Sequence, residues 1–123
     1  MNNHSKTIER LWTLFNQGLF EDSASLFDPK FVATWPQSRE QFIGAENFLL
    51  MNKAYPGEYS ISILRVIEVG DEVISEVKII HDNKPLYAVS FWEFNRGKII
   101  RVVEYWADEG KSPEWRKRWV VRY

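Results

Sequence analysis

The chain has 123 residues, a formal net charge of −1 and no cysteine, which predicts one domain over residues 1–123 that is stable without disulfides. The mixed charges argue against nucleic acid as the main partner, and two histidines without cysteine argue against a metal site. No apolar run is long enough to cross a membrane and no secretory signature opens the chain, so we expect a cytoplasmic protein.

The first half of the chain predicts three helices. An apolar stripe at helical spacing predicts an amphipathic helix over residues 7–17, formed by Ile8, Leu11, Trp12 and Phe15. A short helix is expected over residues 20–26, and it ends ahead of Pro29 because the residue before proline avoids helical backbone angles. The third helix is expected to begin near Ala45 and to stop before Pro56.

Between the second and third helices, the residues 31–35 alternate as a strand that points Phe31, Ala33 and Trp35 the same way. Pro36 restricts this strand to an edge or an end of the sheet. The next residues allow two interpretations. The segment 38–41 resembles a capping box that starts a helix, whereas 41–44 resembles a short return strand; we favour the hairpin.

From Tyr59 onward the apolar period changes to two, which indicates strands. Four strands are predicted, joined by turn-forming residues, over 59–69, 73–81, 86–94 and 99–106. Helices that come first and a meander of antiparallel strands that follows are typical of an α+β fold.

The last turn, residues 95–98, predicts that Phe94 pairs with Ile99. Counting back from this pair places six side chains on one face of the sheet, namely Tyr87, Val89, Phe91, Val102, Glu104 and Trp106. The same register extended across the preceding turn adds Glu76 and Lys78 to this face and leaves His81 on the other, as a surface turn histidine. Both faces are largely apolar, so we expect helices to cover one and a second copy of the chain to cover the other.

Glu104 is the most informative residue, because it is an acid among apolar neighbours on a strand that should be buried. Burial raises the pKa of a carboxyl group, and a base poised near neutral pH can remove a proton next to a carbonyl. The alternative is a structural acid that pairs with Lys78 or accepts a hydrogen bond from a tyrosine. Glu76 and Lys78 either flank the same cavity or form a solvated or dimer-facing pair.

Aromatic residues make up 15% of the chain, with six tryptophans. This predicts a pocket for a small apolar or aromatic molecule, lined in part by Trp35, Tyr55, Tyr87 and Trp106, with core packing as the alternative role for each ring. The basic and aromatic segment 115–123 is expected to be a packed terminal segment or a dimer contact rather than a binding site for nucleic acid or membrane.

The order and spacing of several short segments resemble the nuclear transport factor 2-like superfamily and, within it, the SnoaL-like group. These segments are residues 31–38, 43–48, 55–57, 97–106 and 113–116. The resemblance covers nearly the whole chain. It implies three N-terminal helices packed on a strongly curved antiparallel sheet, in a cone-shaped, cystatin-like α+β barrel with an apolar pocket at its mouth, and frequent homodimers.

Enzymes of this superfamily include polyketide cyclases, ketosteroid isomerases, scytalone dehydratases and epoxide hydrolases, and other members are non-enzymatic binding modules. By position, Glu104 resembles the acid that cyclase-like members carry on the final strand. The isomerase-like acid near the first strand is absent from Trp35-Pro36-Gln37-Ser38, and no Asp-Arg-Asp set of the epoxide hydrolases can be assembled. The resemblance implies cofactor-independent chemistry with Glu104 as base and Tyr87 as hydroxyl donor, or a ligand carrier without catalysis.

Overall fold

The computed structural model describes residues 3–123 of the chain. Ten elements follow one another along it: α1 (His4–Asn16), η1 (Glu21–Leu26), β1 (Phe27–Trp35), β2 (Glu40–Ile43), α2 (Ala45–Ala54), β3 (Tyr59–Val69), β4 (Glu72–His81), β5 (Lys84–Asn95), β6 (Lys98–Asp108) and η2 (Glu114–Trp119). The α+β class, the β1–β2 hairpin and the four-stranded meander are confirmed. Of the helices between residues 3 and 123, none is both long and apolar enough to cross a membrane.

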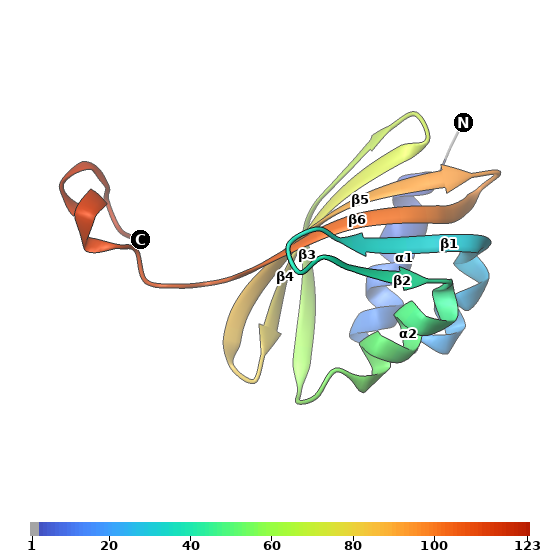
Figure 1. The fold of residues 1–123 in the computed structure, drawn as a ribbon, viewed down its shortest axis with the longest axis horizontal. Helices are drawn as coiled ribbons and strands as arrows, with labels where there is room; N and C mark the ends of the chain where they lie inside the picture. The colour runs from blue at the N-terminus through green and yellow to red at the C-terminus, as the bar shows by residue number, and fades with distance from the viewer. Residues whose placement is uncertain (1–2) are drawn as a thin grey trace.

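The sheet has six strands in the order β2-β1-β6-β5-β4-β3, and the helices cover one of its faces (Figure 1). We call the covered face the inner face and the opposite one the outer face. The expectation of a purely antiparallel sheet is wrong at one place, because β1 pairs with β6 in parallel. The sheet does not close into a barrel, since β2 and β3 form its two edges. The parallel pair joins strands nearly seventy residues apart, a relation that turn chemistry does not reveal.

Three N-terminal α-helices are not confirmed. α1 and α2 are α-helices, whereas η1 is a six-residue 3-10 helix, and η2, near the C-terminus, was not expected. The shortness of η1 explains its geometry, since a segment of this length forms few i to i−4 hydrogen bonds and the extended residues before Pro29 follow at once.

The core lies between the helices and the inner face of the sheet. The predicted stripe of α1 is buried there against β3 and β4, while α2 packs on β1 and β2. The largest fully buried side chains of the core include Trp92, Phe31, Phe48, Ile8 and Leu11. Burial of this stripe stabilises α1 far more than helix propensity does.

A bulge in the β5–β6 pair changes the predicted faces. Phe94 pairs with Ile99 as predicted, but the register shifts between Glu93 and Phe94. Glu104 therefore lies opposite Ser90 instead of Val89. Since side chains alternate along a strand, this shift of one residue moves every β5 residue that was predicted to face Glu104 to the other face.

The β4–β5 pairing differs from the expected one by two residues, with Leu86 opposite Ile79 instead of His81. A shift of two keeps each side chain on its face, so Glu76 and Lys78 do share a face with Tyr87, as predicted. That face is the outer one, however, and Glu104 lies on the inner one.

After β6 the chain leaves the body of the protein. Residues 109–123, which we call the C-terminal arm, extend away from the sheet with η2 near the tip (Figure 1). The side chains of Trp115 and Trp119 are 72% and 70% exposed. The expectation that this segment packs on its own chain is therefore wrong, and its other predicted role, as a dimer contact, is untested.

Candidate functional site

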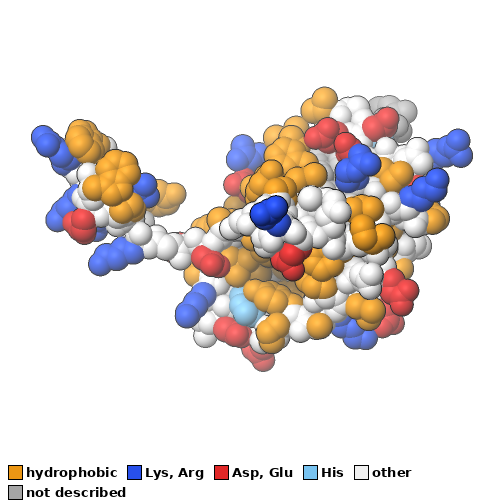
Figure 2. Space-filling model, viewed as in Figure 1, with side chains coloured by type: hydrophobic (Ala, Val, Ile, Leu, Met, Phe, Trp, Pro, Cys, Tyr) orange, Lys and Arg blue, Asp and Glu red, His pale blue; other side chains and the backbone are white. Residues whose placement is uncertain are grey.

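A cavity of about 460 Å³ opens on the inner face at the end of the sheet where β6 stops. Its walls come from the β1–β2 turn, the last turns of α2, and β5 and β6. The lining residues are Trp35, Gln37, Ser38, Glu40, Met51, Asn52, Tyr55, Leu86, Glu104, Trp106 and Asp108. Hydrophobic side chains gather around this hollowed part of the surface (Figure 2). The volume lies in the range of sites that bind small molecules.

The Glu104 carboxylate belongs to the wall of this cavity and is only 1% exposed. Its Oε1 accepts hydrogen bonds from the indole N–H groups of Trp35, at 3.1 Å, and Trp106, at 3.0 Å. Its Oε2 accepts a hydrogen bond of 2.6 Å from the hydroxyl of Ser90. Three neutral donors therefore surround a buried acid.

No cation offsets this charge. Among residues 3–123, the ion pairs found do not include Glu104, and Lys78 lies on the outer face. The alternative in which Glu104 pairs with Lys78 or a tyrosine hydroxyl is thus not the arrangement observed. Burial raises the pKa of Glu104, and the hydrogen bonds from Ser90, Trp35 and Trp106 offset this only in part.

The sheet pairing explains how these residues come together. Trp106 follows Glu104 by two positions on β6 and so points to the same face. The parallel pairing of β1 with β6 places Trp35, the last residue of β1, beside them. Ser90 lies directly opposite Glu104 on β5.

A second cluster of polar side chains lies next to the Glu104 cluster on the inner face. Ser75, on β4, is opposite Ser90, and its Oγ accepts hydrogen bonds from the indoles of Trp12, at 3.1 Å, and Trp92, at 2.9 Å. Ser75 and Ser90 are both fully buried. Sequence reasoning missed both serines, although each stands at the inner-facing position of an alternating strand, which is the signal that a correct register would have supplied.

The rim of the cavity is formed in part by Tyr55, whose ring stacks on His81 with centroids 4.4 Å apart. Nε2 of His81 lies 2.6 Å from the carbonyl oxygen of Pro56. Burial, followed by the charges of Asp108 and Asp82, raises the pKa of Tyr55, so its hydroxyl stays protonated and can donate a hydrogen bond. His81 shares the inner face with Ile79, so its expected place on the opposite face is wrong.

The structure brings together four of the predicted pocket residues and separates the others. Trp35, Tyr55, Glu104 and Trp106 line the cavity, and Val102 is fully buried in the core on the same face. Five predicted residues lie on the outer face because of the bulge, namely Glu76, Lys78, Tyr87, Val89 and Phe91. None of these five therefore lines the cavity.

The outer-face residues have partners of their own. The hydroxyl of Tyr87 donates a hydrogen bond of 3.2 Å to Glu109, and Glu76 forms an ion pair of 2.9 Å with Arg65. Nζ of Lys78 lies 6.0 Å from the centroid of the Tyr87 ring. Seven lining residues were not predicted, because turns and the ends of helices and strands carry no pattern that points to a cavity: Gln37, Ser38, Glu40, Met51, Asn52, Leu86 and Asp108. Among the described residues, no group of three or more acidic, histidine or cysteine side chains is arranged to hold a metal ion.

The sequence model of the SnoaL-like domain matches residues 8–102. The chain belongs to the SnoaL-like family. Glu104 and Trp106 lie just beyond the matched range, so the match itself does not include the centre of the cavity. The comparison with curated proteins found no significant match.

Solved structures share the fold of this SnoaL-like protein. An NTF-2 like protein of unknown function from Burkholderia xenovorans LB400 is 26% identical, with a TM-score of 0.84 over 98% of this chain and 94% of that one. A ketosteroid isomerase-like protein from Kribbella flavida DSM 17836 is 23% identical, with a TM-score of 0.88 over 98% and 89%. A protein similar to SnoaL-like polyketide cyclases, from Jannaschia sp. CCS1, is 13% identical, with a TM-score of 0.72 over 86% and 87%. The last two likenesses concern the fold alone.

Proposed function

We propose that this SnoaL-like protein binds a small apolar or aromatic carbonyl compound in the cavity and moves a proton on it, as an isomerase or cyclase does. One observation carries the proposal: a fully buried carboxylate, which forms no ion pair with any of the residues 3–123, is part of the wall of a mainly apolar cavity. Acids with a raised pKa in a cleft are typical of sites of proton transfer.

In this proposal Glu104 is the general base. A carboxylate can accept about four hydrogen bonds, and three are made here, two on Oε1 and one on Oε2. The remaining acceptor position on Oε2 takes the proton from the carbon next to the substrate carbonyl. Trp35 and Trp106 hold the carboxylate in place, and their rings contact the apolar part of the substrate.

In this proposal the hydroxyl of Tyr55 takes the role that was expected of Tyr87. It donates a hydrogen bond to the carbonyl oxygen, on which negative charge develops as the proton leaves. Its place at the rim of the cavity supports this role, and a tyrosine hydroxyl keeps its proton at neutral pH. The proton returns from Glu104 to another carbon, so the cycle is balanced without a cofactor.

The experiment has two stages. Native mass spectrometry of gently purified protein reports any retained small molecule. A panel of alicyclic and aromatic ketones in D₂O is then followed by NMR for exchange of the protons next to the carbonyl. We expect exchange with the wild-type protein and a loss of about 10²- to 10⁴-fold in Glu104→Gln.

Glu104→Gln is a conservative change at this position. The amide oxygen still accepts from both indoles, and the amide nitrogen donates to the Ser90 hydroxyl, so all three contacts have a counterpart. Glu76→Gln, on the outer face, is the matched control and leaves exchange unchanged. Equal exchange in wild type and Glu104→Gln would show that Glu104 is not the base.

The second candidate is a ligand carrier without catalysis. It is favoured by the same three donors, which already satisfy most of the carboxylate and would suit a structural role. A retained molecule that binds wild type and Glu104→Gln equally, with no proton exchange in either, would favour this candidate.

A homodimer through the outer face also belongs to the proposal, as does a cytoplasmic location. The outer face is rich in partly exposed apolar side chains, with Ile67 44% and Tyr105 45% exposed. Apolar patches of this kind on a sheet mark sites of protein association. Sedimentation velocity across a concentration series tests the dimer.

A further inference from the structure

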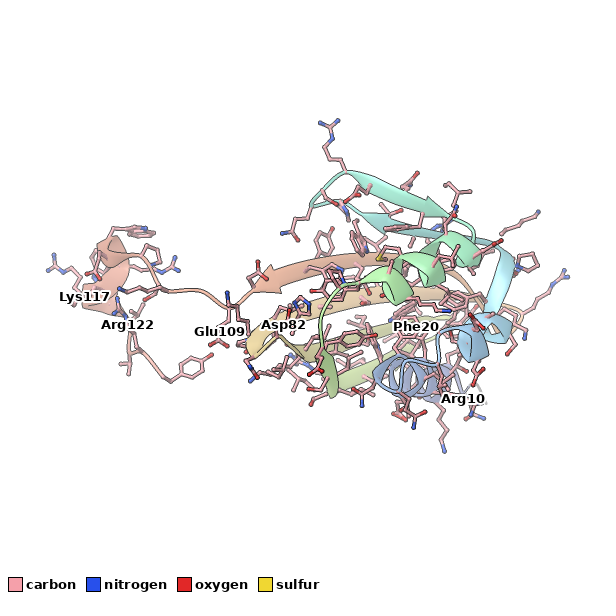
Figure 3. All side chains as sticks on the ribbon, turned by 90° about the horizontal axis from the view of Figure 1, so that it is seen from below. Arg10, Phe20, Asp82, Glu109, Lys117 and Arg122 are labelled. Atoms are coloured by element: carbon pink, nitrogen blue, oxygen red, sulfur yellow. The ribbon has the colours of Figure 1, made fainter. Side chains whose placement is uncertain are left out.

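The C-terminal arm carries the most exposed apolar side chains of the described chain. Trp115, Trp119, Val121 and Tyr123 are all at least 70% exposed. Figure 3 shows Lys117 and Arg122 on the arm, away from the sheet. None of the hydrogen bonds and ion pairs found among residues 3–123 joins residues 110–123 to the body of the protein. Aromatic side chains that are exposed to solvent, on an arm without hydrogen bonds or ion pairs to the body, indicate a surface that contacts a partner.

The charge of the arm is opposite to that of the body. Residues 109–123 contain five basic and two acidic side chains, a net charge of +3, whereas residues 1–108 contain the other eleven basic and fifteen acidic ones, a net charge of −4. Within the arm, Glu114 lies near both Lys117, at 3.9 Å, and Arg122, at 3.5 Å. The remaining excess of positive charge is complementary to the body of another copy of the chain.

The outer face offers a groove for this arm. A hollow of about 340 Å³ lies between β4, β5 and β6, on the side of the sheet that no helix covers. Its floor includes Phe91, Val103 and Tyr105, and Glu72 and Glu93 stand at its rim, Glu93 as the partner of Arg101. Arg101 offsets only one of the two glutamates, so the groove keeps a net negative charge beside its apolar side chains, which fits tryptophan side chains flanked by arginine and lysine.

We propose that the C-terminal arm of one protomer docks into the outer-face groove of a second copy. The arm leaves from the end of β6, whereas the groove reaches to Arg101 near the start of that strand. A two-fold axis that runs across the strands brings the end of β6 of one copy over the Glu72 end of its partner. Each copy then gives an arm and receives one, as an isologous interface requires.

The area that the rings of the arm can bury overlaps the range of stable dimers. Aromatic side chains bury roughly 150–250 Å² each, so the three rings of each arm supply about 900–1,500 Å² over two copies. Specific interfaces bury about 1,200–2,000 Å². The six-residue η2 is too short to lie in a membrane surface as an amphipathic helix, so the second copy fits the arm better than a lipid surface does.

Sedimentation velocity across a concentration series tests the proposal with the full chain. We compare wild type, the double variant Trp115→Ser with Trp119→Ser, and the control Leu50→Ser, an exposed apolar residue of α2. We expect a wild-type dimer, association weaker by at least about tenfold in the double variant, and no change in the control. A cooperative thermal unfolding transition of the monomeric double variant shows that the body remains folded, although the transition temperature falls once the stabilising contribution of the dimer is lost.

A cross-linking experiment locates the contact, because the chain has no cysteine of its own. One chain carries Val121→Cys with one tag, a second chain carries Glu72→Cys with another tag, and the two proteins are mixed and oxidised. We expect a disulfide between the two chains, and much less of it when Leu50→Cys replaces Glu72→Cys.

Three results would overturn the proposal. The first is a wild-type monomer at every concentration. The second is a dimer that the double variant leaves unchanged, which would keep the sheet dimer and remove the arm from it. The third is wild-type binding to phosphatidylserine vesicles or to an RNA that the double variant loses, while its oligomeric state stays the same. None of these measurements involves the cavity, and Glu104→Gln should remain dimeric, so failure of the proposed function is recognised separately.

Discussion

The Glu104 side chain is stabilised by neutral hydrogen-bond donors instead of a cation, and its burial as a carboxylate is costly in free energy. Moving an isolated carboxylate out of water costs several kcal/mol even after the protein relaxes. Hydrogen bonds from Trp35, Trp106 and Ser90 recover part of this free energy. The cost of burial exceeds the gain from the hydrogen bonds, so the neutral form of the Glu104 carboxyl group is more favoured than it would be in water, as the raised pKa indicates.

This balance predicts how pH affects stability. The pKa of Glu104 is raised in the folded state, so its stabilising contribution is fully present below the unfolded pKa of about 4.3 and is lost as the pH rises through the folded pKa. The free energy of unfolding of wild type should therefore fall relative to Glu104→Gln in this window, by up to about 1.4 kcal/mol per pH unit. Urea unfolding of both proteins between pH 4 and pH 8 measures the difference.

The opposite slope has a clear meaning. If wild type gains stability relative to Glu104→Gln as the pH rises, the three donors hold the pKa below its ordinary value and Glu104 is a structural acid. Glu76→Gln is the control again, since Glu76 is a partly exposed residue of an ion pair on the outer face.

At the level of elements, short connections decide the shape of the cavity. Gly57, between α2 and β3, has φ +89°. The backbone N–H of Glu58 donates a hydrogen bond of 2.9 Å to the carboxylate of Asp82, in the β4–β5 turn. The two connections thus hold each other, and with them the end of α2 that carries Tyr55 to the rim of the cavity.

Gly57→Ala should disrupt this contact. A Cβ atom at residue 57 would overlap the Asp82 carboxylate, and the positive φ is strained for any residue with a side chain. We expect a loss of about 1–3 kcal/mol in the free energy of unfolding, measured by urea denaturation. Gly110→Ala is the matched control, because nothing lies within 4 Å of its Cβ position, and it should stay within about 0.5 kcal/mol of wild type. Equal stability of both variants would show that this junction is free to adjust.

At the level of the whole molecule, the cavity couples ligand binding to stability. A ligand that binds only the folded state adds about 2.7 kcal/mol to the free energy of unfolding at a concentration of 100 times Kd. It should also change the tryptophan fluorescence, because Trp35 and Trp106 line the cavity.

Thermal unfolding with the ligand identified by native mass spectrometry measures this stabilisation. Lys78→Ala, on the outer face, should keep it in full. Loss of the stabilisation in Lys78→Ala would place the ligand on the outer face, where the sequence-derived register put the pocket.

The sequence by itself determined α1, α2 and the strands of this protein, but not the 3-10 geometry of η1 or the presence of η2. Period-two apolar residues, turn residues and the α1 stripe are local signals, and β3 was predicted with the bounds that the structure has. It also singled out Glu104, since an acid among apolar neighbours is visible without a fold.

Only the tertiary structure decided which residues face Glu104. A single bulge between Glu93 and Phe94 reverses the faces of β5 relative to β6, and it brings Ser90 to the carboxylate in place of Val89. The parallel β1–β6 pair, which adds Trp35, joins residues far apart in the chain. Both depend on packing summed over the whole sheet, which no local pattern records, and this is why the sequence could single out Glu104 but not the residues around it.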